Sequence, residues 1–100
     1  MPIKTEATIM TTDGLITCMA ENISIGGLFV RMDKGIEMGT ESEITVPLPS
    51  SAIHKVIVLN GVAVRIQNNG VAFKFRDVGH DTFCTLASFI DYSMQSGPPS

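Results

Sequence analysis

Residues 22–27, which read Asn-Ile-Ser-Ile-Gly-Gly, carry the side chains best suited to hold a small polar ligand. The Asn22 amide and the Ser24 hydroxyl both donate and accept hydrogen bonds, either to a ligand or to the nearby backbone. Gly26 and Gly27 permit positive φ angles and let another group approach the backbone closely. The same residue types are common in ordinary connections between strands. Residue types alone therefore leave two interpretations open, a polar binding loop or a tight structural bend.

Two other side chains with reactive chemistry, His80 and Cys84, are four residues apart and can share one face of a helix. Zinc needs three or four ligands, and the sequence has no spaced set of Cys and His residues to complete them. Cys84 lies beside an apolar stripe, which favours a half-buried thiol over a catalytic Cys–His pair. The glutamates at 37, 41 and 43 are typical of a solvated strand edge. We therefore expect no catalytic residue, no metal site, no cofactor and no enzymatic activity.

Alternating apolar and polar residues predict that β-strands position these side chains. The face of residues 3–10 that is expected to point inward carries Ile3, Thr5, Ala7 and Ile9. Asp13-Gly14 and Asn69-Gly70 are typical of tight turns between strands. The predicted strands cover residues 3–10, 15–20, 28–32, 43–48, 56–67 and 71–76.

Residues 56–67 contain Asn60-Gly61 between two apolar runs, which is a strong hairpin signal. The alternative is one long strand with a bulge at Gly61. In either case, residues 71–76 are expected to pair with the second half of this segment. The shared face of that pair is expected to hold Val62, Val64, Ile66, Val71, Phe73 and Phe75.

A helix is predicted over residues 81–93, because the apolar period changes from two to 3.6 after Gly79. Asp81 or Thr82 can cap its start. One stripe of the helix holds Phe83, Leu86, Ala87 and Ile90. We expect Phe83, Leu86 and Ile90 to cover one opening of a barrel. A single domain is expected over residues 1–94, followed by a flexible tail at 95–100.

The composition predicts a globular, cytoplasmic protein, because 44% of its 100 residues are hydrophobic and no run approaches the ~18 apolar residues that a membrane span needs. A net charge of −3 with only seven scattered Lys and Arg residues argues against DNA or RNA as a partner. Two cysteines make no disulfide framework. Strands followed by one terminal helix predict an all-β barrel or sandwich with a helix docked on it.

Segment 22–27 resembles the Asp/Asn-x-Ser-x-x-Gly signature of the PilZ domain family, with Asn22, Ser24 and Gly27 at the three defined positions. The apolar strand 28–30 follows it, as in the family. Other segments are similar to further strands of the family and to its closing helix, and the resemblance extends over residues 3–93. These segments are Gly39 with residues 44–49, residues 61–65 from Gly61 to Arg65, residues 70–75 with Gly70 and Phe73, and residues 86–90.

The resemblance implies a six-stranded antiparallel barrel of Greek-key type with one C-terminal α-helix, acting in bacterial cyclic di-GMP signalling. It favours one continuous strand over 56–67, irregular near Gly61. If cyclic di-GMP binding is retained, the implied ligand-binding residues are Asn22, Ser24, Gly26, Gly27 and Arg31. Family members grip the nucleotide phosphates with an Arg-x-x-x-Arg arm upstream of this motif. Here no arginine precedes Asn22, and no Arg-x-x-x-Arg occurs anywhere in the sequence.

Two hypotheses of function follow from the missing arm. In the first, the domain is an adaptor that acts through protein contacts in motility, pilus or biofilm control, with cyclic di-GMP binding weak or lost. In the second, it is a true cyclic di-GMP receptor that takes its basic groups from elsewhere, with Arg31, Lys74 and Arg76 as candidates. Loss of two arginine clamps would weaken binding by roughly two to four orders of magnitude.

Overall fold

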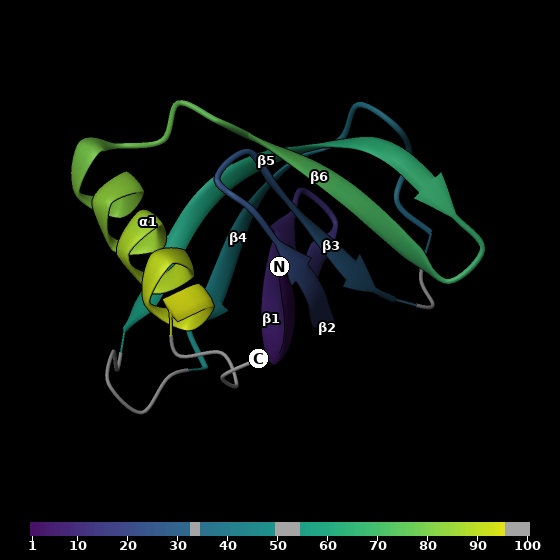
Figure 1. The fold of residues 1–100 in the computed structure, drawn as a ribbon. Helices are drawn as coiled ribbons and strands as arrows, with labels where there is room; N and C mark the ends of the chain where they lie inside the picture. The colour runs from purple at the N-terminus through teal and green to yellow at the C-terminus, as the bar shows by residue number, and fades with distance from the viewer. Residues whose placement is uncertain (33–34, 50–54, 96–100) are drawn as a thin grey trace.

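A closed barrel of six antiparallel strands forms the body of the protein in a computed structural model that describes residues 1–32, 35–49 and 55–95 (Figure 1). The strands follow one another around the barrel in the order β1-β2-β3-β6-β5-β4, and β4 pairs with β1 to close it. This is the predicted fold class. The elements are β1 Pro2–Thr11, β2 Gly14–Ile23, β3 Gly27–Arg31, β4 Glu41–Pro47, β5 Val56–Gln67, β6 Gly70–Arg76 and α1 His80–Gln95.

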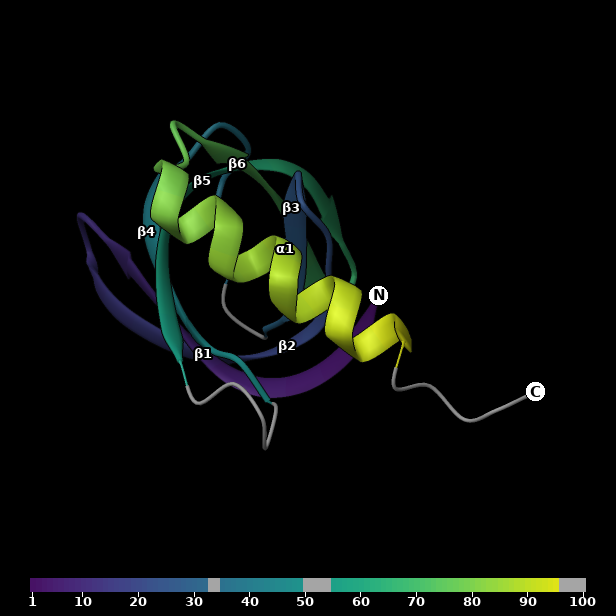
Figure 2. The same cartoon turned by 60° about the vertical axis from the view of Figure 1, so that its left-hand side comes forward.

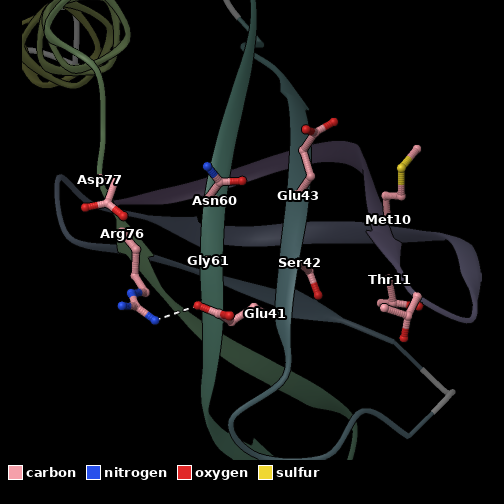
Figure 3. Close-up of a pocket in the computed structure, with 10 residues that line it drawn as sticks. Met10, Thr11, Glu41, Ser42, Glu43, Asn60, Gly61, Arg76 and Asp77 are labelled. Carbon is pink, nitrogen blue, oxygen red and sulfur yellow. Dashed lines mark hydrogen bonds and ion pairs between the residues drawn. The ribbon is translucent and has the colours of Figure 1, made fainter.

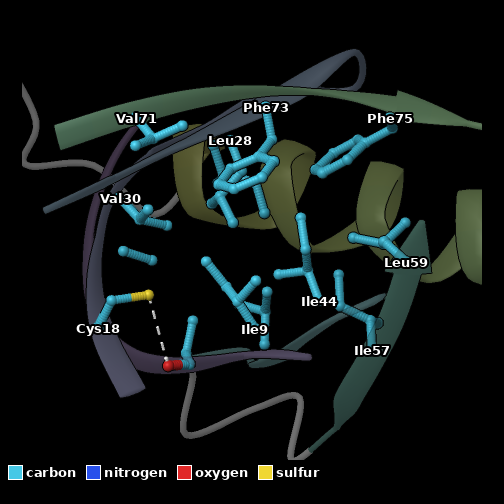
Figure 4. Packing of buried hydrophobic residues seen from close by; sticks show 14 of the residues in the cluster. Ile9, Cys18, Leu28, Val30, Ile44, Ile57, Leu59, Val71, Phe73 and Phe75 are labelled. Atoms are coloured by element: carbon cyan, nitrogen blue, oxygen red, sulfur yellow. Dashed lines mark hydrogen bonds between the residues drawn. The ribbon is translucent and has the colours of Figure 1, made fainter. Parts of the chain in front are cut away.

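The core fills the barrel with one face of every strand (Figure 4). On β1 the predicted inward face is confirmed, since Ala7 and Ile9 are fully buried and Ile3 and Thr5 are half-buried. Opposite Ala7, Cys18 of β2 lies in the core and its thiol donates a hydrogen bond to the Ala7 carbonyl at 3.6 Å. Burial, and to a lesser extent the charge of Glu6, raises the pKa of the Cys18 thiol to about 11.

Strand β5 is one continuous strand, so the hairpin signal at Asn60-Gly61 is overridden. The irregularity lies between Ala63 and Arg65, however, and not at Gly61. Gly61 faces the core directly, and a Cβ atom built on it would lie 2.8 Å from Ile44 Cδ1. Crowding inside the barrel therefore favours a glycine here, because a side chain would require the end of the Ile44 side chain to move.

The prediction of the face that β5 shares with β6 was wrong. Phe73 and Phe75 are buried as expected, but they lie opposite Ala63 and Gly61, whereas Val64 and Ile66 are 45% and 44% exposed. Val62, opposite Lys74, is only half-buried. Two large rings on β6 are accommodated by two small residues on β5, and the extra residue at Val64 then shifts the alternation.

Helix α1 lies across one opening of the barrel, as predicted (Figure 2). Leu86 and Phe89 are 0% and 1% exposed, and Ile90 packs partly buried against the core. Phe83 was expected to cover the opening as well, but it is 43% exposed. The buried stripe is centred on Leu86 and Phe89, so Phe83 lies at its margin in the first turn. The helix continues to Gln95, and the rest of the expected tail, 96–100, falls outside the described residues.

Candidate ligand-binding surface

The polar loop of residues 24–27 is a tight turn held together by Ser24. The Ser24 N–H donates to the Gly27 carbonyl at 2.9 Å, and the Ser24 hydroxyl accepts hydrogen bonds from the N–H groups of Gly26 and Gly27 at 3.3 and 3.2 Å. The same hydroxyl donates to the Gly27 carbonyl at 3.4 Å. All the hydrogen-bonding capacity of this hydroxyl is therefore used inside the turn.

The two glycines of the loop differ in what they do. A Cβ atom on Gly27 would lie 2.4 Å from the Phe73 carbonyl oxygen of β6, so only glycine fits at this position. A Cβ atom on Gly26 would meet nothing within 4 Å. Instead, the Gly26 carbonyl accepts a hydrogen bond from the Phe75 N–H at 2.9 Å, which ties the turn to β6. Gly27 is therefore needed for packing, whereas the side of the loop at Gly26 is open.

Asn22 lies in a row of residues that crosses four strands on the outside of the barrel. Asn22 pairs with Phe29, Phe29 with Ala72, and Ala72 with Arg65. We call these four residues the motif face. A shallow hollow of about 260 Å³ runs along this face and is also lined by Met1, Ser24 and Gly27. In the part of the chain that the structure describes, no hydrogen bond to the Asn22 side chain is found, so its amide is available to a ligand.

Arg65 is the residue of this surface that sequence reasoning missed. It is exposed and lines the hollow together with Asn22, although the two are 43 positions apart in the sequence. Its place depends on the irregularity at Val64, because the extra residue there sets which β5 side chain lies opposite Ala72. The signal that could have found it was the match of residues 61–65 to a family strand that ends in arginine.

Two of the three cations considered from the sequence lie beside the motif face. Arg31 is two residues beyond Phe29 and forms an ion pair with Glu21 at 3.0 Å. Lys74 pairs with Gly27 on the outer surface of β6. Neither lines the hollow. Arg76 lies on another side of the barrel, where it forms an ion pair with Glu41.

Comparison with known proteins places the whole barrel in one family. The family model described as "PilZ domain" matches residues 1–92. The chain belongs to the PilZ domain family. This confirms the resemblance derived from Asn22, Ser24 and Gly27, and with it a place among regulatory domains of cyclic di-GMP signalling. A search of the curated proteins gave no match.

Two solved structures share the PilZ fold with this chain. One is "Structure of Bacillus subtilis Inhibitor of motility (MotI/DgrA)", with a TM-score of 0.79 and 19% identity over 98% of this chain. This chain spans about half of that protein, 51% of its length. The other is the PilZ domain of CeSA from a cellulose synthesizing bacterium, with a TM-score of 0.72 and 17% identity over 95% of this chain and 96% of the other. At identities this low, the TM-scores establish a common fold alone.

His80 and Cys84 lie together on the exposed side of α1, with Cys84 Sγ 3.6 Å from His80 Nε2. The Cys84 thiol was expected to be half-buried, but it is exposed. Among the described residues, no group of three or more His, Cys, Asp or Glu side chains could hold a metal ion. Within the same residues, no helix is both long and apolar enough to span a membrane.

Proposed function

We propose that this PilZ domain is a non-catalytic adaptor that acts through protein contacts and binds cyclic di-GMP weakly through its own residues. The observation that carries the proposal is the composition of the hollow on the motif face. Among its described lining residues Arg65 is the one cationic side chain, where a dianionic ligand held by an arginine pair would need two. Residues 1–21 contain no arginine.

The bonding of Ser24 also supports weak binding. Its hydroxyl makes three hydrogen bonds within the turn, so it can hydrogen-bond to a guanine base only if one of them is broken. The Asn22 amide and the open backbone at Gly26 remain for the ligand. A hydrogen bond to a charged group contributes about 1.5–3 kcal/mol, so Arg65 replaces part of the missing clamp and not all of it.

A partner protein in a motility, pilus or biofilm machine would receive the signal. Support for motility as the first pathway to test comes from the fold shared with a protein that is named as an inhibitor of motility.

A true cyclic di-GMP receptor is the second candidate, and a specific observation favours it. The barrel brings Arg31 and Lys74 to the outer surface on either side of the motif face, with Arg65 in its lining. Of these three cations, only Arg31 forms an ion pair with a carboxylate of a described residue. A ligand that bridges these three cations would regain phosphate contacts without an upstream arm.

A titration with cyclic di-GMP, followed by backbone amide NMR shifts, separates the two candidates. The adaptor proposal expects shifts only at high nucleotide concentration, confined to residues 22–28 and the neighbours of Arg65. Arg65→Ala should abolish these shifts, and Arg76→Ala, which removes another exposed arginine from a different side of the barrel, should leave them unchanged. A sub-micromolar dissociation constant for the unaltered chain would overturn the adaptor proposal and establish the receptor.

Restoring the arm tests the site itself. Met1 lines the hollow, and its carbonyl accepts a hydrogen bond from the Ile23 N–H at 2.9 Å. The C-terminal end of an Arg-x-x-x-Arg arm grafted ahead of Pro2 would therefore lie at the hollow. The graft should strengthen binding, and added salt should reduce the gain because phosphate charge is involved. No gain on grafting would mean that the Asn22 loop no longer forms a nucleotide site.

A further inference from the structure

A second surface of the barrel carries exposed apolar side chains beside an excess of carboxylates. It surrounds the hairpin between β1 and β2, which projects from the side of the barrel (Figure 2). Met10 and Leu15 are cross-strand partners on this hairpin and are 53% and 61% exposed. Met38, in the nearby loop, is 64% exposed. Large apolar side chains gathered in this way are typical of interaction sites.

The hairpin stands between two hollows. One, of about 460 Å³, lies toward β4 and β5 (Figure 3), and the other, of about 530 Å³, lies toward residues 35–40. Thr11 and Thr12 line both. We call the lining of the two hollows, which includes Leu15, together with Met38, the hairpin surface.

The charge of the hairpin surface is strongly negative. Five carboxylates line the two hollows, and Arg76 is the one cationic side chain among the described lining residues. Arg76 is already paired with Glu41. A cationic partner would therefore find unneutralised carboxylates here. They belong to Asp13, Glu37, Glu43 and Asp77.

Among the described residues, one buried polar atom in the first hollow lacks a hydrogen-bond partner. Ser42 is 6% exposed, and its hydroxyl oxygen makes no hydrogen bond. It lines the hollow just past Met10 and Glu43, the last pair between β1 and β4. In Figure 3 its hydroxyl points away from the Glu43 carboxylate and toward the side on which Thr11 lies. A buried hydroxyl left unpaired costs about 1–3 kcal/mol, which a donor entering this hollow would recover.

From these observations we infer that the hairpin surface binds a basic amphipathic segment of a partner protein. Lysine or arginine side chains of the segment pair with Glu43 and Asp13, and one of them donates to Ser42. Apolar side chains of the segment cover Met10, Leu15 and Met38. The inference rests on the adaptor function proposed above, and it assigns the partner contact to a surface away from the motif face.

The test uses a short dye-labelled peptide in which lysine alternates with leucine, titrated into the whole chain without nucleotide. Binding should be saturable, weakened by salt, and absent for a peptide with glutamate in place of lysine. Leu15→Ser should weaken binding about tenfold because an apolar contact is lost. Glu43→Lys should weaken it about threefold to tenfold. Both side chains are exposed, so the variants are expected to fold, which far-ultraviolet circular dichroism checks.

Matched substitutions elsewhere separate specific docking from general attraction. Glu6→Lys makes the same charge change on β1, four residues from Met10, and Ile66→Ser removes an exposed apolar side chain from β5. Neither should change peptide affinity by more than about twofold. Equal effects of Glu6→Lys and Glu43→Lys, an unchanged affinity for Leu15→Ser, or amide shifts centred on residues 22–29 would each overturn the inference. Failure here leaves the cyclic di-GMP titration as a separate test of the proposed function.

Discussion

The motif face and the hairpin surface share strands β2 and β5 but present opposite chemistry. On β5, Arg65 belongs to the motif face and Asn60 to the hairpin surface. On β2, Asn22 lies at one end and Leu15 at the other. The motif face offers an amide, an aromatic ring and an arginine, whereas the hairpin surface offers carboxylates and exposed apolar side chains.

This difference shows how little a total charge says about partners. The sequence carries −3 overall, with seven Lys and Arg residues dispersed along it. Antiparallel pairing brings Arg31, Arg65 and Lys74 to one side of the barrel and leaves Glu43 and Asp77 on another. One small barrel thereby has two surfaces suited to partners of opposite charge.

The largest effect on stability is expected from a substitution in the core, which supports both surfaces. Leu86 is fully buried where α1 covers the barrel, so Leu86→Ala should destabilise the fold by about 2–5 kcal/mol. Urea denaturation measures the change. Phe83→Ala removes a larger side chain that is 43% exposed and should cost much less. Equal urea midpoints for Leu86→Ala and the unaltered chain would show that α1 does not close the barrel.

Titration of Cys18 tests the packing of β2, which contributes to both surfaces. Cys18 faces inward from this strand, between Leu15 and Asn22. Its pKa is raised from 9.0 to about 11, so between these pH values the unfolded chain loses the thiol proton while the folded chain keeps it. Stability should therefore be complete below pH 9 and fall by about 2–3 kcal/mol as the pH rises to 11.

Urea midpoints measured across this pH range for the unaltered chain and for Cys18→Ala provide the check. Cys18→Ala should be less stable at neutral pH, because it leaves a cavity in the core. Between pH 9 and 11, however, its stability should fall less than that of the unaltered chain, because the titrating thiol is gone. Parallel pH profiles for the two proteins would contradict burial of Cys18. The exposed Cys84 gives an internal comparison, because it should react with iodoacetamide in the folded state while Cys18 does not.

A pair of glycine substitutions tests the close approach of β3 to β6 beside the motif face. Gly27→Ala places a Cβ atom 2.4 Å from the Phe73 carbonyl, so β3 and β6 must separate, at a cost of about 1–3 kcal/mol. Gly26→Ala places one in open space and should be close to neutral. Thermal unfolding of the two variants gives the comparison, and amide shifts of residues 10–15 should stay unchanged in both. A neutral Gly27→Ala would mean that the two strands do not approach this closely.

The sequence predicted the barrel well because each strand needed only local alternation. Residues 3–10 show period two, and Ala7 and Ile9 are buried accordingly. Asn60-Gly61 is a strong local turn signal, yet Gly61 lies within a continuous strand, where Ile44 and Phe73 of other strands leave little room for a side chain. Such crowding is a tertiary effect that no window of sequence contains.

The candidate site could be predicted only in part for the same reason. Asn22, Ser24 and Gly27 lie close together in the sequence, so a motif pointed to them. Arg65 reaches the motif face through pairing across β6 and β3 and through one extra residue at Val64, and a shift of one position would move it to another face. Arg31 was expected in the site and lies beside it, paired with Glu21.

The smallest effect is expected for the hydroxyl of Ser24, which either stabilises the turn of residues 24–27 or hydrogen-bonds to a base of the ligand. Three hydrogen bonds within the turn use this hydroxyl, so Ser24→Ala should destabilise the fold by about 0.5–1.5 kcal/mol. In the arm-grafted chain the same substitution should weaken cyclic di-GMP binding by about 1 kcal/mol, either directly or through the altered turn. Ser24→Thr keeps the hydroxyl and serves as the matched control.

Reduced stability, with amide shifts at Gly26 and Gly27 before any nucleotide is added, would assign Ser24 to the architecture of the turn. Unchanged stability with a loss of affinity would assign it to the ligand, and the motif face would then be a better nucleotide site than its bonding indicates.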